Sequence, residues 1–237
     1  MEPWQERTAL LFGEEGLSRL QASHVLVVGV GGVGGAAAEM LARSAVGHIT
    51  LVDADTVEAS NINRQLPALH STLGRGKCEV VAERIRDINP GAAVDIISEY
   101  ICEDNIDALL GGLRPDFVVD AIDTLSPKIA LIQWCLGNGL RLVSSMGSGA
   151  KTDATKVRLA DISKTRECPL AHQLRKRLHR LGIVEGFLAV YSEERPDREA
   201  VVLEEGRNKK SNVGTVSYLP AVFGCVCAQA AICGIVK

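Results

Sequence analysis

The stretch HVLVVGVGGVGG, residues 24–35, decides the fold of this chain. Its first five residues form a short apolar run that ends at a glycine, which is typical of a buried strand. Gly29, Gly31 and Gly34 then fit the pattern G-x-G-x-x-G, and an alanine- and leucine-rich segment that predicts a helix follows them. A strand, a glycine-rich turn and a helix in this order predict a fold of the dinucleotide-binding type.

The alternation of strand and helix continues toward the C-terminus. Strands are predicted at 24–28, 48–52, 94–97, 117–122, 141–145, 157–162 and 187–192, helices at 34–43, 77–88, 104–110, 128–137, 169–181 and 219–235, and a charged loop at 193–210. This pattern predicts a Rossmann-like α/β fold, a mostly parallel sheet with helices on both faces and a C-terminal sheet extension. We expect a single domain over 1–237, with a nucleotide-binding core at about 22–150 and an extension at about 151–237.

Composition and charge narrow the class of protein. The chain has 237 residues, and 46% of them are apolar, which is enough for a sizeable core. A net charge of −3 gives no global case for nucleic-acid binding, so such a site needs a local basic patch. Seven cysteines without paired C-x-x-C spacing predict neither a disulfide framework nor a zinc site, and they favour the reducing cytoplasm. We find no secretory signal, and polar residues interrupt the apolar stretch 213–236, which predicts a buried helix rather than a membrane span.

The glycine-rich turn is a candidate phosphate site. Its glycines allow a tight turn, a close approach of backbone to phosphate, and packing of the helix on the strand. The start of the helix offers free N–H groups and a partial positive charge to an anion. Asp53 ends the next predicted strand, where a carboxylate can accept hydrogen bonds from a ribose hydroxyl. We expect nucleotide binding here; the alternative is a turn that only packs. The P-loop motif G-x-x-x-x-G-K-S/T does not occur.

Three charged residues further along favour a triphosphate over a dinucleotide. Arg64 can grip a phosphate with its planar fork, and Lys77 can supply a point charge. Asp123 follows the predicted strand 117–122, where ligands gather in open α/β sheets, and its carboxylate could hold Mg²⁺ on phosphate oxygens. Each residue taken singly could be a solvated surface charge or a strand-end cap. Their joint order predicts ATP and Mg²⁺, and it argues against a nicotinamide oxidoreductase.

Longer stretches around these residues resemble the ubiquitin-activating-enzyme superfamily of ThiF/MoeB-like adenylating enzymes. The matching stretches are GVGGVGG (29–35), LVDADTVEASNINRQ (51–65), GRGKCEVVAERIRDINP (74–90) and VVDAIDTLSPK (118–128). Within the superfamily the chain is most similar to the branch of tRNA threonylcarbamoyladenosine dehydratases, through RTALLFGEEGLSRL (7–20), NINRQLPALH (61–70), AIDTLSPK (121–128) and DISKTRECPLAHQLRKRL (161–178). The resemblance covers nearly the whole chain.

The resemblance implies a role for each matching position. These are a nucleotide loop of Gly29, Gly31, Gly32 and Gly34, a ribose contact at Asp53 with Asp55 as a second acidic contact, triphosphate contacts from Asn61, Arg64 and Lys77, and a Mg²⁺ position at Asp123. Arg7 matches an arginine that reaches the ATP site of the partner subunit, which implies a homodimer. A monovalent cation, K⁺ or Na⁺, is also implied, without ligands that the sequence can place.

The implied reaction adenylates a carboxylate of the tRNA substrate, and the threonylcarbamoyl group then closes on itself and expels AMP. Catalysis of this kind depends on positioning and on charge stabilisation. Two other functions stay open. The chain could adenylate the C-terminus of a ubiquitin-like sulfur carrier, or it could be a non-catalytic nucleotide-sensing or scaffold protein. The lack of paired C-x-x-C motifs disfavours the sulfur-carrier function, and the intact charged set disfavours the scaffold.

The cysteines and one basic helix complete the set of candidates. Cys225 and Cys227 form C-x-C without a second pair, so we expect buried side chains rather than zinc. Cys168 could act as a nucleophile in an electropositive segment, although the dehydratase branch commonly has an acidic residue there. Leucines at 170, 174, 178 and 181 predict an inward stripe on helix 169–181. The outward basic residues are candidates for tRNA contact, with a solvated face as the alternative: Arg166, Arg175, Lys176 and Arg177.

Overall fold

The computed structural model describes residues 2–203 and 211–237 of the chain. Its strands are β1 (His24–Val28), β2 (His48–Val52), β3 (Ala93–Ile97), β4 (Phe117–Asp120), β5 (Leu142–Ser145), β6 (Val157–Asp161), β7 (Leu188–Ser192), β8 (Val201–Leu203) and β9 (Ser211–Val213). Its α-helices are α1 (Glu6–Ala22), α2 (Gly32–Arg43), α3 (Lys77–Ile88), α4 (Ile106–Leu110), α5 (Leu125–Gly137), α6 (Pro169–Arg180) and α7 (Tyr218–Val236). Short 3-10 helices are η1 (Pro3–Gln5), η2 (Ala59–Asn61), η3 (His70–Thr72), η4 (Ala154–Lys156) and η5 (Ile162–Lys164).

Seven strands form one sheet in the order β3-β2-β1-β4-β5-β7-β6. All pairs are parallel except β6 with β7, which is antiparallel. The strand order reverses at β1, which pairs with β2 on one side and with β4 on the other. In open α/β sheets, ligands bind in the crevice outside the carboxyl ends of the strands at such a point. The turns after β1, β2 and β4 meet at this edge of the sheet, called the carboxyl edge below.

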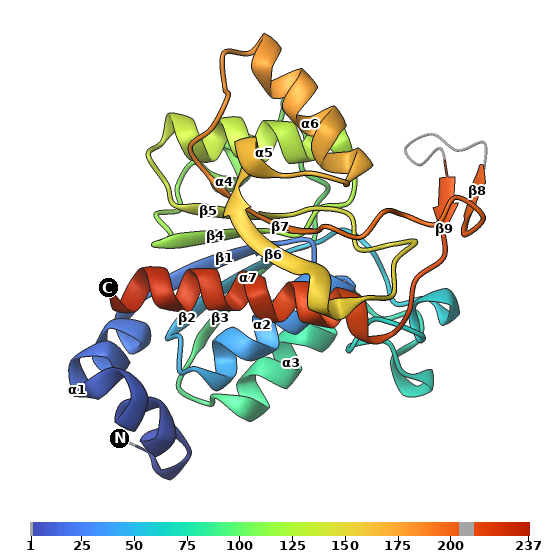
Figure 1. The fold of residues 1–237 in the computed structure, drawn as a ribbon. Helices are drawn as coiled ribbons and strands as arrows, with labels where there is room; N and C mark the ends of the chain where they lie inside the picture. The colour runs from blue at the N-terminus through green and yellow to red at the C-terminus, as the bar shows by residue number, and fades with distance from the viewer. Residues whose placement is uncertain (1, 204–210) are drawn as a thin grey trace.

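Helices cover both faces of the sheet (Figure 1): α2, α3 and α7 lie on one face, and α4, α5 and α6 lie on the other. Successive residues of β1 alternate between the two cores, as the pleat of a strand requires. Val25 and Val27 pack in the cluster with α2 and α7, whereas Leu26 and Val28 pack in the cluster with α5. The predicted Rossmann-like architecture is therefore confirmed, including the C-terminal extension of the sheet by β6 and β7.

The last helix, α7, belongs to the core. By length and composition it is the one helix of the described chain that could cross a membrane. It packs closely on α2, because a Cβ placed on Gly224 would lie 2.4 Å from the carbonyl oxygen of Val33. A Cβ on Gly32 would likewise lie 2.9 Å from Cβ of Pro220. Close packing of this kind makes α7 a buried helix, which is what its apolar composition predicts.

Helix α1 was not predicted from the sequence. This helix has no clean apolar stripe, since Leu10 and Leu11 are 80% and 75% exposed while Leu17 and Leu20 are buried. Gly13 interrupts it with a φ of 74°, a conformation that favours glycine. The periodicity on which helix prediction depends is therefore broken at the middle of the segment.

Several predicted boundaries were wrong in ways that affect the site. Helix α2 begins at Gly32, inside the glycine motif, rather than at residue 34. Strand β4 ends at Asp120 rather than at 122, and α5 begins at Leu125 rather than at 128. The charged segment 193–210 is not a loop throughout, because β8 lies within it and pairs with β9. The rest of that segment, 204–210, lies outside the described residues.

Candidate nucleotide-binding site

The glycine turn after β1 folds tightly and leaves no room for side chains at Gly29 and Gly34. Gly29 has a φ of 83°, and a Cβ on it would lie 2.9 Å from the carbonyl oxygen of Ala121. A Cβ on Gly34 would lie 1.7 Å from the carbonyl oxygen of Gly29. The turn therefore lies directly against the segment that follows β4. Because α2 starts at Gly32, the unpaired N–H groups of its first turn are at the carboxyl edge, where an anion can bind them.

Asp53, the residue after β2, holds the glycine turn in place. One carboxylate oxygen accepts a hydrogen bond from the backbone N–H of Val30 at 2.8 Å, and the other accepts from the N–H of Asp55 at 2.9 Å. Each carboxylate oxygen has two lone pairs, so both can accept further hydrogen bonds. The side chain predicted to contact ribose thus also links the ends of β1 and β2, and it is only partly buried.

Lys77 and Asp55 form an ion pair at the same edge. Lys77 Nζ lies 2.7 Å from Asp55 Oδ2, and the backbone N–H of Lys77 donates to the Asp55 carbonyl. The lysine side chain is 8% exposed, whereas the aspartate side chain is 71% exposed. As the first residue of α3, Lys77 keeps its ammonium group next to the Asp53 turn. A buried cation with an exposed counter-ion can exchange that partner for an incoming phosphate.

The segment 61–65 lies over the start of α2. The carbonyl oxygen of Arg64 would be 3.0 Å from a Cβ on Gly32. Arg64 Nη1 donates to the Ser60 carbonyl at 2.7 Å and to Asn63 Oδ1 at 2.8 Å. Asn61 is buried, and its Oδ1 accepts from the backbone N–H of Glu58 at 3.2 Å. The structure thus places Asn61 beside the turn as part of its framework. The Arg64 guanidinium contacts only residues that are near it in the sequence, among those that the structure describes.

Gln65 is a residue at the site that the sequence analysis gave no role. Its side chain lies against Gly31, where a Cβ would be 3.5 Å from Nε2. Its Oε1 is buried and accepts no hydrogen bond from the residues that the structure describes. The only signal in the sequence was its place directly after Arg64. An orphaned amide beside the glycine turn marks a position where a ligand or a water would bind.

Asp123 lies in the loop between β4 and α5, three residues beyond the strand end rather than at it. It is exposed, and its loop lies against the glycine turn, since Ile122 N would be 3.3 Å from a Cβ on Gly29. Within the described residues, no three His, Cys, Asp or Glu side chains gather into a metal cluster. Mg²⁺ commonly uses one or two carboxylates together with phosphate oxygens and waters, so the carboxylate of Asp123 fits that mode of binding.

The carboxylate at the end of β4 belongs to Asp120, and it is paired with a buried lysine that sequence analysis missed. Lys128 and Asp120 are both fully buried, with Nζ 2.7 Å from Oδ2. Lys128 Nζ also donates to Ser144 Oγ at 3.1 Å and to the Ser145 carbonyl at 3.0 Å. Asp120 Oδ1 accepts from the backbone N–H of Ile122 at 3.1 Å. This network ties β4, α5 and β5 together beneath the Asp123 loop.

Arg7 lies far from these residues within the chain. Helix α1 ends two residues before β1 begins, so it lies at the amino edge of the sheet, opposite the carboxyl edge. Figure 1 shows α1 extending away from the sheet at that end. Arg7 is exposed there, beside the exposed Leu10 and Leu11. The structure therefore does not bring Arg7 to the nucleotide site of its own chain.

Helix α6 carries the basic residues, but its faces differ from the prediction. Leu174 and Leu178 are buried, whereas Leu181 follows the helix and is 50% exposed, so it is not part of the inward stripe. Arg175 is half-buried and donates to Thr165 Oγ1 instead of pointing outward. Two further residues, Lys176 and Arg177, are exposed as predicted.

Arg166 precedes α6 and is exposed, but it is not an isolated cation. Its guanidinium forms an ion pair with Glu193, which lies just after β7. The same carboxylate also pairs with Arg158 of β6 at 3.3 Å. The free positive surface of this region is therefore smaller than the sequence composition indicates.

The three cysteines considered in the sequence analysis differ in their surroundings. Cys227 is buried in α7 as predicted, and burial raises the pKa of its thiol. Cys225 is exposed, so the prediction that it is buried was wrong, although its partial burial also raises the pKa of its thiol. Thiols with raised pKa values are poor nucleophiles and poor metal ligands at neutral pH. Cys168 is the N-cap residue of α6, and its Sγ would be 3.9 Å from a Cβ on Gly147. It too is buried.

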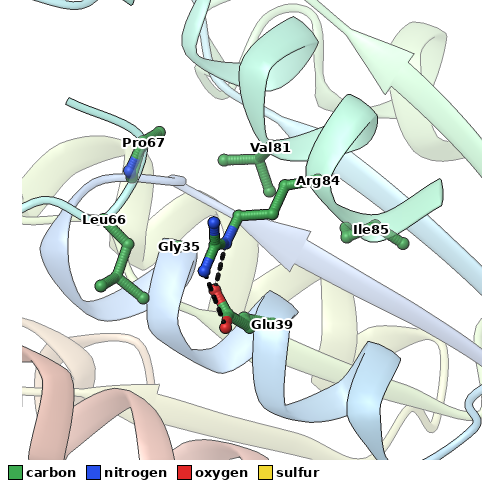
Figure 2. A pocket seen from close by; sticks show the side chains of 7 residues that line it. All are labelled: Gly35, Glu39, Leu66, Pro67, Val81, Arg84 and Ile85. Carbon is green, nitrogen blue, oxygen red and sulfur yellow. Dashed lines mark hydrogen bonds and ion pairs between the residues drawn. The ribbon is translucent and has the colours of Figure 1, made fainter. Parts of the chain in front are cut away.

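Two cavities lie outside this set of residues. The smaller, of about 10 Å³, lies between α2 and α3 (Figure 2) and is lined by Gly35, Glu39, Leu66, Pro67, Val81, Arg84 and Ile85. Arg84 forks onto Glu39 there and lowers the pKa of that carboxyl through its hydrogen bonds. A space that fits about one water is a packing defect rather than a ligand site. The larger cavity, about 470 Å³, adjoins the carboxyl edge at β5 and β7.

Comparisons with known proteins agree on one family. The ThiF family matches residues 5–237. The chain is 43% identical to tRNA threonylcarbamoyladenosine dehydratase of Bacillus subtilis (strain 168), over 93% of this chain and 89% of that protein. It is 38% identical to the protein of the same name from Escherichia coli (strain K12), over 98% and 94%. The crystal structure of E. coli tRNA N6-threonylcarbamoyladenosine dehydratase in complex with ATP superposes with a TM-score of 0.89 at 36% identity, covering 98% of this chain and 93% of that chain. The chain belongs to the ThiF family.

Proposed function

We propose that this protein is an ATP-dependent enzyme that adenylates the carboxylate of a threonylcarbamoyl group beside the anticodon of a tRNA and cyclises that group. The observation that carries the proposal is the meeting of four features at the carboxyl edge: the glycine turn, Asp53, Lys77 and the Asp123 loop. The similarity to two tRNA threonylcarbamoyladenosine dehydratases, over nearly their whole length, supports the choice of this activity within the family.

The nucleotide roles follow from the placement of these groups. The turn of Gly29, Gly31, Gly32 and Gly34 would bind phosphates through the start of α2, and Asp53 would accept from the ribose hydroxyls, with Asp55 nearby. Arg64 would leave its carbonyl contact to grip a phosphate, and Lys77 would leave Asp55 in the same way. Asn61 would support this triphosphate side from its buried position.

The reaction has two stages that this chain would assist by positioning. A carboxylate oxygen of the substrate attacks the α-phosphorus of ATP, the bond to the bridging oxygen breaks, and pyrophosphate leaves. An atom of the same threonylcarbamoyl group then attacks the activated carbonyl carbon, and AMP leaves with one carboxylate oxygen. Asp123 would hold Mg²⁺, which when bound neutralises phosphate charge. The buried network of Lys128 and Asp120 would keep the Asp123 loop in place.

A homodimer is part of the proposal. Arg7 lies at the amino edge, so it could reach a nucleotide only in a second copy of the chain. The exposed apolar side chains of the same helix, Leu10 and Leu11, support a contact between copies there. Because arginine forks onto phosphate oxygens, an Arg7 from the partner would stabilise the leaving pyrophosphate.

The proposal also covers tRNA contact, location, a monovalent cation and the extent of the domain. We include tRNA contact by α6, chiefly through Lys176 and Arg177, since Arg166 and Arg175 are engaged with protein partners. We also include a cytoplasmic location and a monovalent cation, K⁺ or Na⁺, without a ligand set. Residues 1–237 would act as one adenylating domain, with a nucleotide core at about 22–150 and the extension at about 151–237 sharing one sheet.

One experiment tests the function. The protein is incubated with ATP and threonylcarbamoylated tRNA, and the nucleosides are examined by mass spectrometry, with ATP–pyrophosphate exchange measured in parallel. We expect a product lighter by one water and exchange that depends on the modified tRNA. Exchange driven instead by a carrier protein ending in Gly-Gly would favour the sulfur-carrier alternative. A protein that does not bind ATP would refute both.

A further inference from the structure

Lys151 is a buried cation that has few partners. It lies in the segment after β5 and is 4% exposed. Within the described chain its Nζ has one hydrogen-bond acceptor, the carbonyl oxygen of Ser192 at 3.3 Å. An ammonium group has three N–H donors, and burying a charge without a full set of partners is costly. Burial accordingly lowers the pKa of Lys151, against the opposing influence of Cys168, Glu194 and Glu167.

Lys151 lines the larger cavity, of about 470 Å³, together with three loop segments. The lining residues are Ala150, Lys151, Thr152, Glu194, Asp197, Ala200, Gly214, Thr215 and Val216. The volume is in the range of small-ligand sites, roughly 300–1,000 Å³. Among the lining residues of the described chain, Lys151 carries the one positive charge. Lys151 is therefore the residue of this lining that could offer ammonium donors to an anionic ligand.

Two carboxylates, Glu194 and Asp197, line the cavity beside Lys151, and both are also engaged elsewhere. The Glu194 carboxylate already accepts from the backbone N–H groups of Thr152, at 3.0 Å, and Asp153, at 2.7 Å. Asp197 accepts from the backbone N–H of Glu199 at 2.9 Å and is exposed. Their charges are thus turned toward backbone donors or toward solvent. An anion that enters the cavity would pair with Lys151.

The cavity adjoins the proposed nucleotide site on the side away from the ribose position. Lys151 bonds to the end of β7, whereas Asp53 follows β2 on the other side of β1. A chain of contacts joins the two places, because Asn63 accepts from Arg64 at 2.8 Å and donates to the carbonyl of Thr215 at 3.1 Å. A group held in the cavity would approach the phosphates from the side opposite the adenosine.

We propose that this cavity receives the carboxylate-bearing group of the acceptor substrate, and that the Lys151 ammonium donates hydrogen bonds to that carboxylate. The proposal rests on the proposed function, because it needs an acceptor whose carboxylate is adenylated. It names the residue that tells a modified tRNA from an unmodified one. The phosphates of the nucleotide have their own donors at the start of α2 and at Lys77, so they do not need Lys151.

The test compares Lys151→Met with Lys156→Met in the full chain. Lys156 is a matched control, since it lies five residues away on η4, its side chain is 49% exposed, and it pairs with Asp153 at the surface. We expect Lys151→Met to raise the KM for threonylcarbamoylated tRNA by about 10- to 100-fold in ATP–pyrophosphate exchange, the range for losing a charged hydrogen bond. Binding of ATP should stay within about twofold of the wild type. Lys156→Met should change neither quantity.

Competition binding gives a readout that does not need turnover. The wild type should prefer threonylcarbamoylated over unmodified tRNA, and Lys151→Met should lose most of that preference while its affinity for unmodified tRNA stays the same. Lys151→Arg should restore part of the preference, because it restores the positive charge. An unchanged preference in Lys151→Met would overturn the proposal. So would an equal loss of ATP binding, which would place Lys151 on the nucleotide.

A second variant covers the possibility that Lys151→Met does not fold. Ala200→Leu adds volume on the far side of the cavity, on a partly exposed loop, without removing a charge. It should raise the KM for the modified tRNA and leave the thermal unfolding temperature unchanged. If the wild type itself shows no tRNA-dependent exchange, the proposed function fails, and this inference fails with it. If the wild type shows exchange but neither variant changes the KM, only the inference fails.

Discussion

Lys128 and Lys151 are both buried near the carboxyl edge of the sheet, but their surroundings differ. Lys128 Nζ has three partners, the carboxylate of Asp120 among them, at 2.7 to 3.1 Å. Among the residues that the structure describes, Lys151 has one carbonyl at 3.3 Å, and it lines a cavity. The first lysine is satisfied by the protein alone. The second is satisfied only if something else enters, so burial by itself does not distinguish a structural charge from a functional one.

The location of each lysine explains the difference. Lys128 is in α5 and reaches the ends of two adjacent strands, β4 and β5, whose polar groups need a donor once they are buried. Lys151 is in a loop and reaches the end of one strand, β7, whereas its loop neighbours such as Thr152 are already paired with Glu194. A charge between secondary-structure elements is part of the fold, whereas a charge between loops is available to a ligand.

The largest effect should come from breaking the first pair. Lys128→Met would leave the Asp120 carboxylate buried without its counter-ion, which we expect to lower the free energy of unfolding by about 3–5 kcal/mol. Lys151→Met should cost less than about 1 kcal/mol, because it removes a poorly compensated buried charge. Urea unfolding of both variants measures the two costs side by side. Equal costs would remove the distinction between the two lysines.

A double variant separates charge from shape. Asp120→Asn combined with Lys128→Met removes both charges and should recover a large part of the lost stability, since a buried pair is expensive to break but not to replace. If the double variant is as unstable as Lys128→Met alone, packing rather than charge holds β4 to α5, and the network described here is not what fixes the loop.

Asp123 gives the next largest effect, and it is an effect on rate rather than on folding. Asp123→Asn keeps the size of the side chain but removes the charge that we assign to Mg²⁺. We expect ATP–pyrophosphate exchange to fall by about 100-fold or more, the magnitude seen when one charge-stabilising group is lost from an active site. Thermal unfolding should not change, because the residue is exposed. Near-normal exchange in this variant would place the metal elsewhere.

His24 tests whether burial shifts the pKa of a basic group even where the carboxylates of Asp116 and Asp95 oppose the shift. It is half-buried, stacks on His48 and has a pKa lowered from 6.5 to about 4, first by burial and then by His48. The unfolded chain therefore binds a proton at a higher pH than the folded one, so stability falls as the pH drops from about 6.5 to 4. Allowing for the solvent exposure of the ring, we expect about 1–2 kcal/mol of loss.

The measurement is urea unfolding of the wild type and His24→Gln between pH 7 and pH 4. The variant should lose less stability over this range, because glutamine does not titrate and can still bond to Thr50 Oγ1, which the histidine ring contacts at 2.8 Å. His172→Gln, at an exposed site on α6, is the matched control and should follow the wild type. Parallel pH curves for the wild type and His24→Gln would contradict the assignment.

Features that depend on local sequence could be predicted, whereas contacts between distant segments could not. The structure brings the glycine turn, Asp53 and Lys77 to one edge because strand ends and helix starts are local patterns that the parallel sheet places together. Asp123 was placed at a strand end that is really Asp120, because an apolar run does not show where pairing stops. The partners of Lys128 could not be predicted, since Ser144 lies 16 residues away and meets it only in the sheet.

The cavity between loops and the helix α1 are two features that could not be predicted from the sequence. Lys151 meets residues 194–200 and 214–216 only after the whole fold has formed, and no periodicity marks such a meeting. Helix α1 was missed because Leu10 and Leu11 face outward. Side chains that serve a partner or a ligand break the rule that apolar residues turn inward, and pattern analysis depends on that rule.

The smallest effect concerns α6, the helix beside Cys168 that carries the exposed Lys176 and Arg177. Each phosphate contact adds about one unit to the slope of log affinity against log salt. Replacing both residues by alanine should lower the slope of tRNA binding by about 1 to 2 and weaken binding by roughly two- to fivefold at moderate salt. Arg175→Ala is the sharper comparison, because that guanidinium is turned to Thr165, so its loss should leave the slope unchanged. A slope that responds to Arg175→Ala and not to the double variant would mean that the Arg175 side of α6 contacts tRNA. The exposed side with Lys176 and Arg177 would then be a solvated surface without a role in binding.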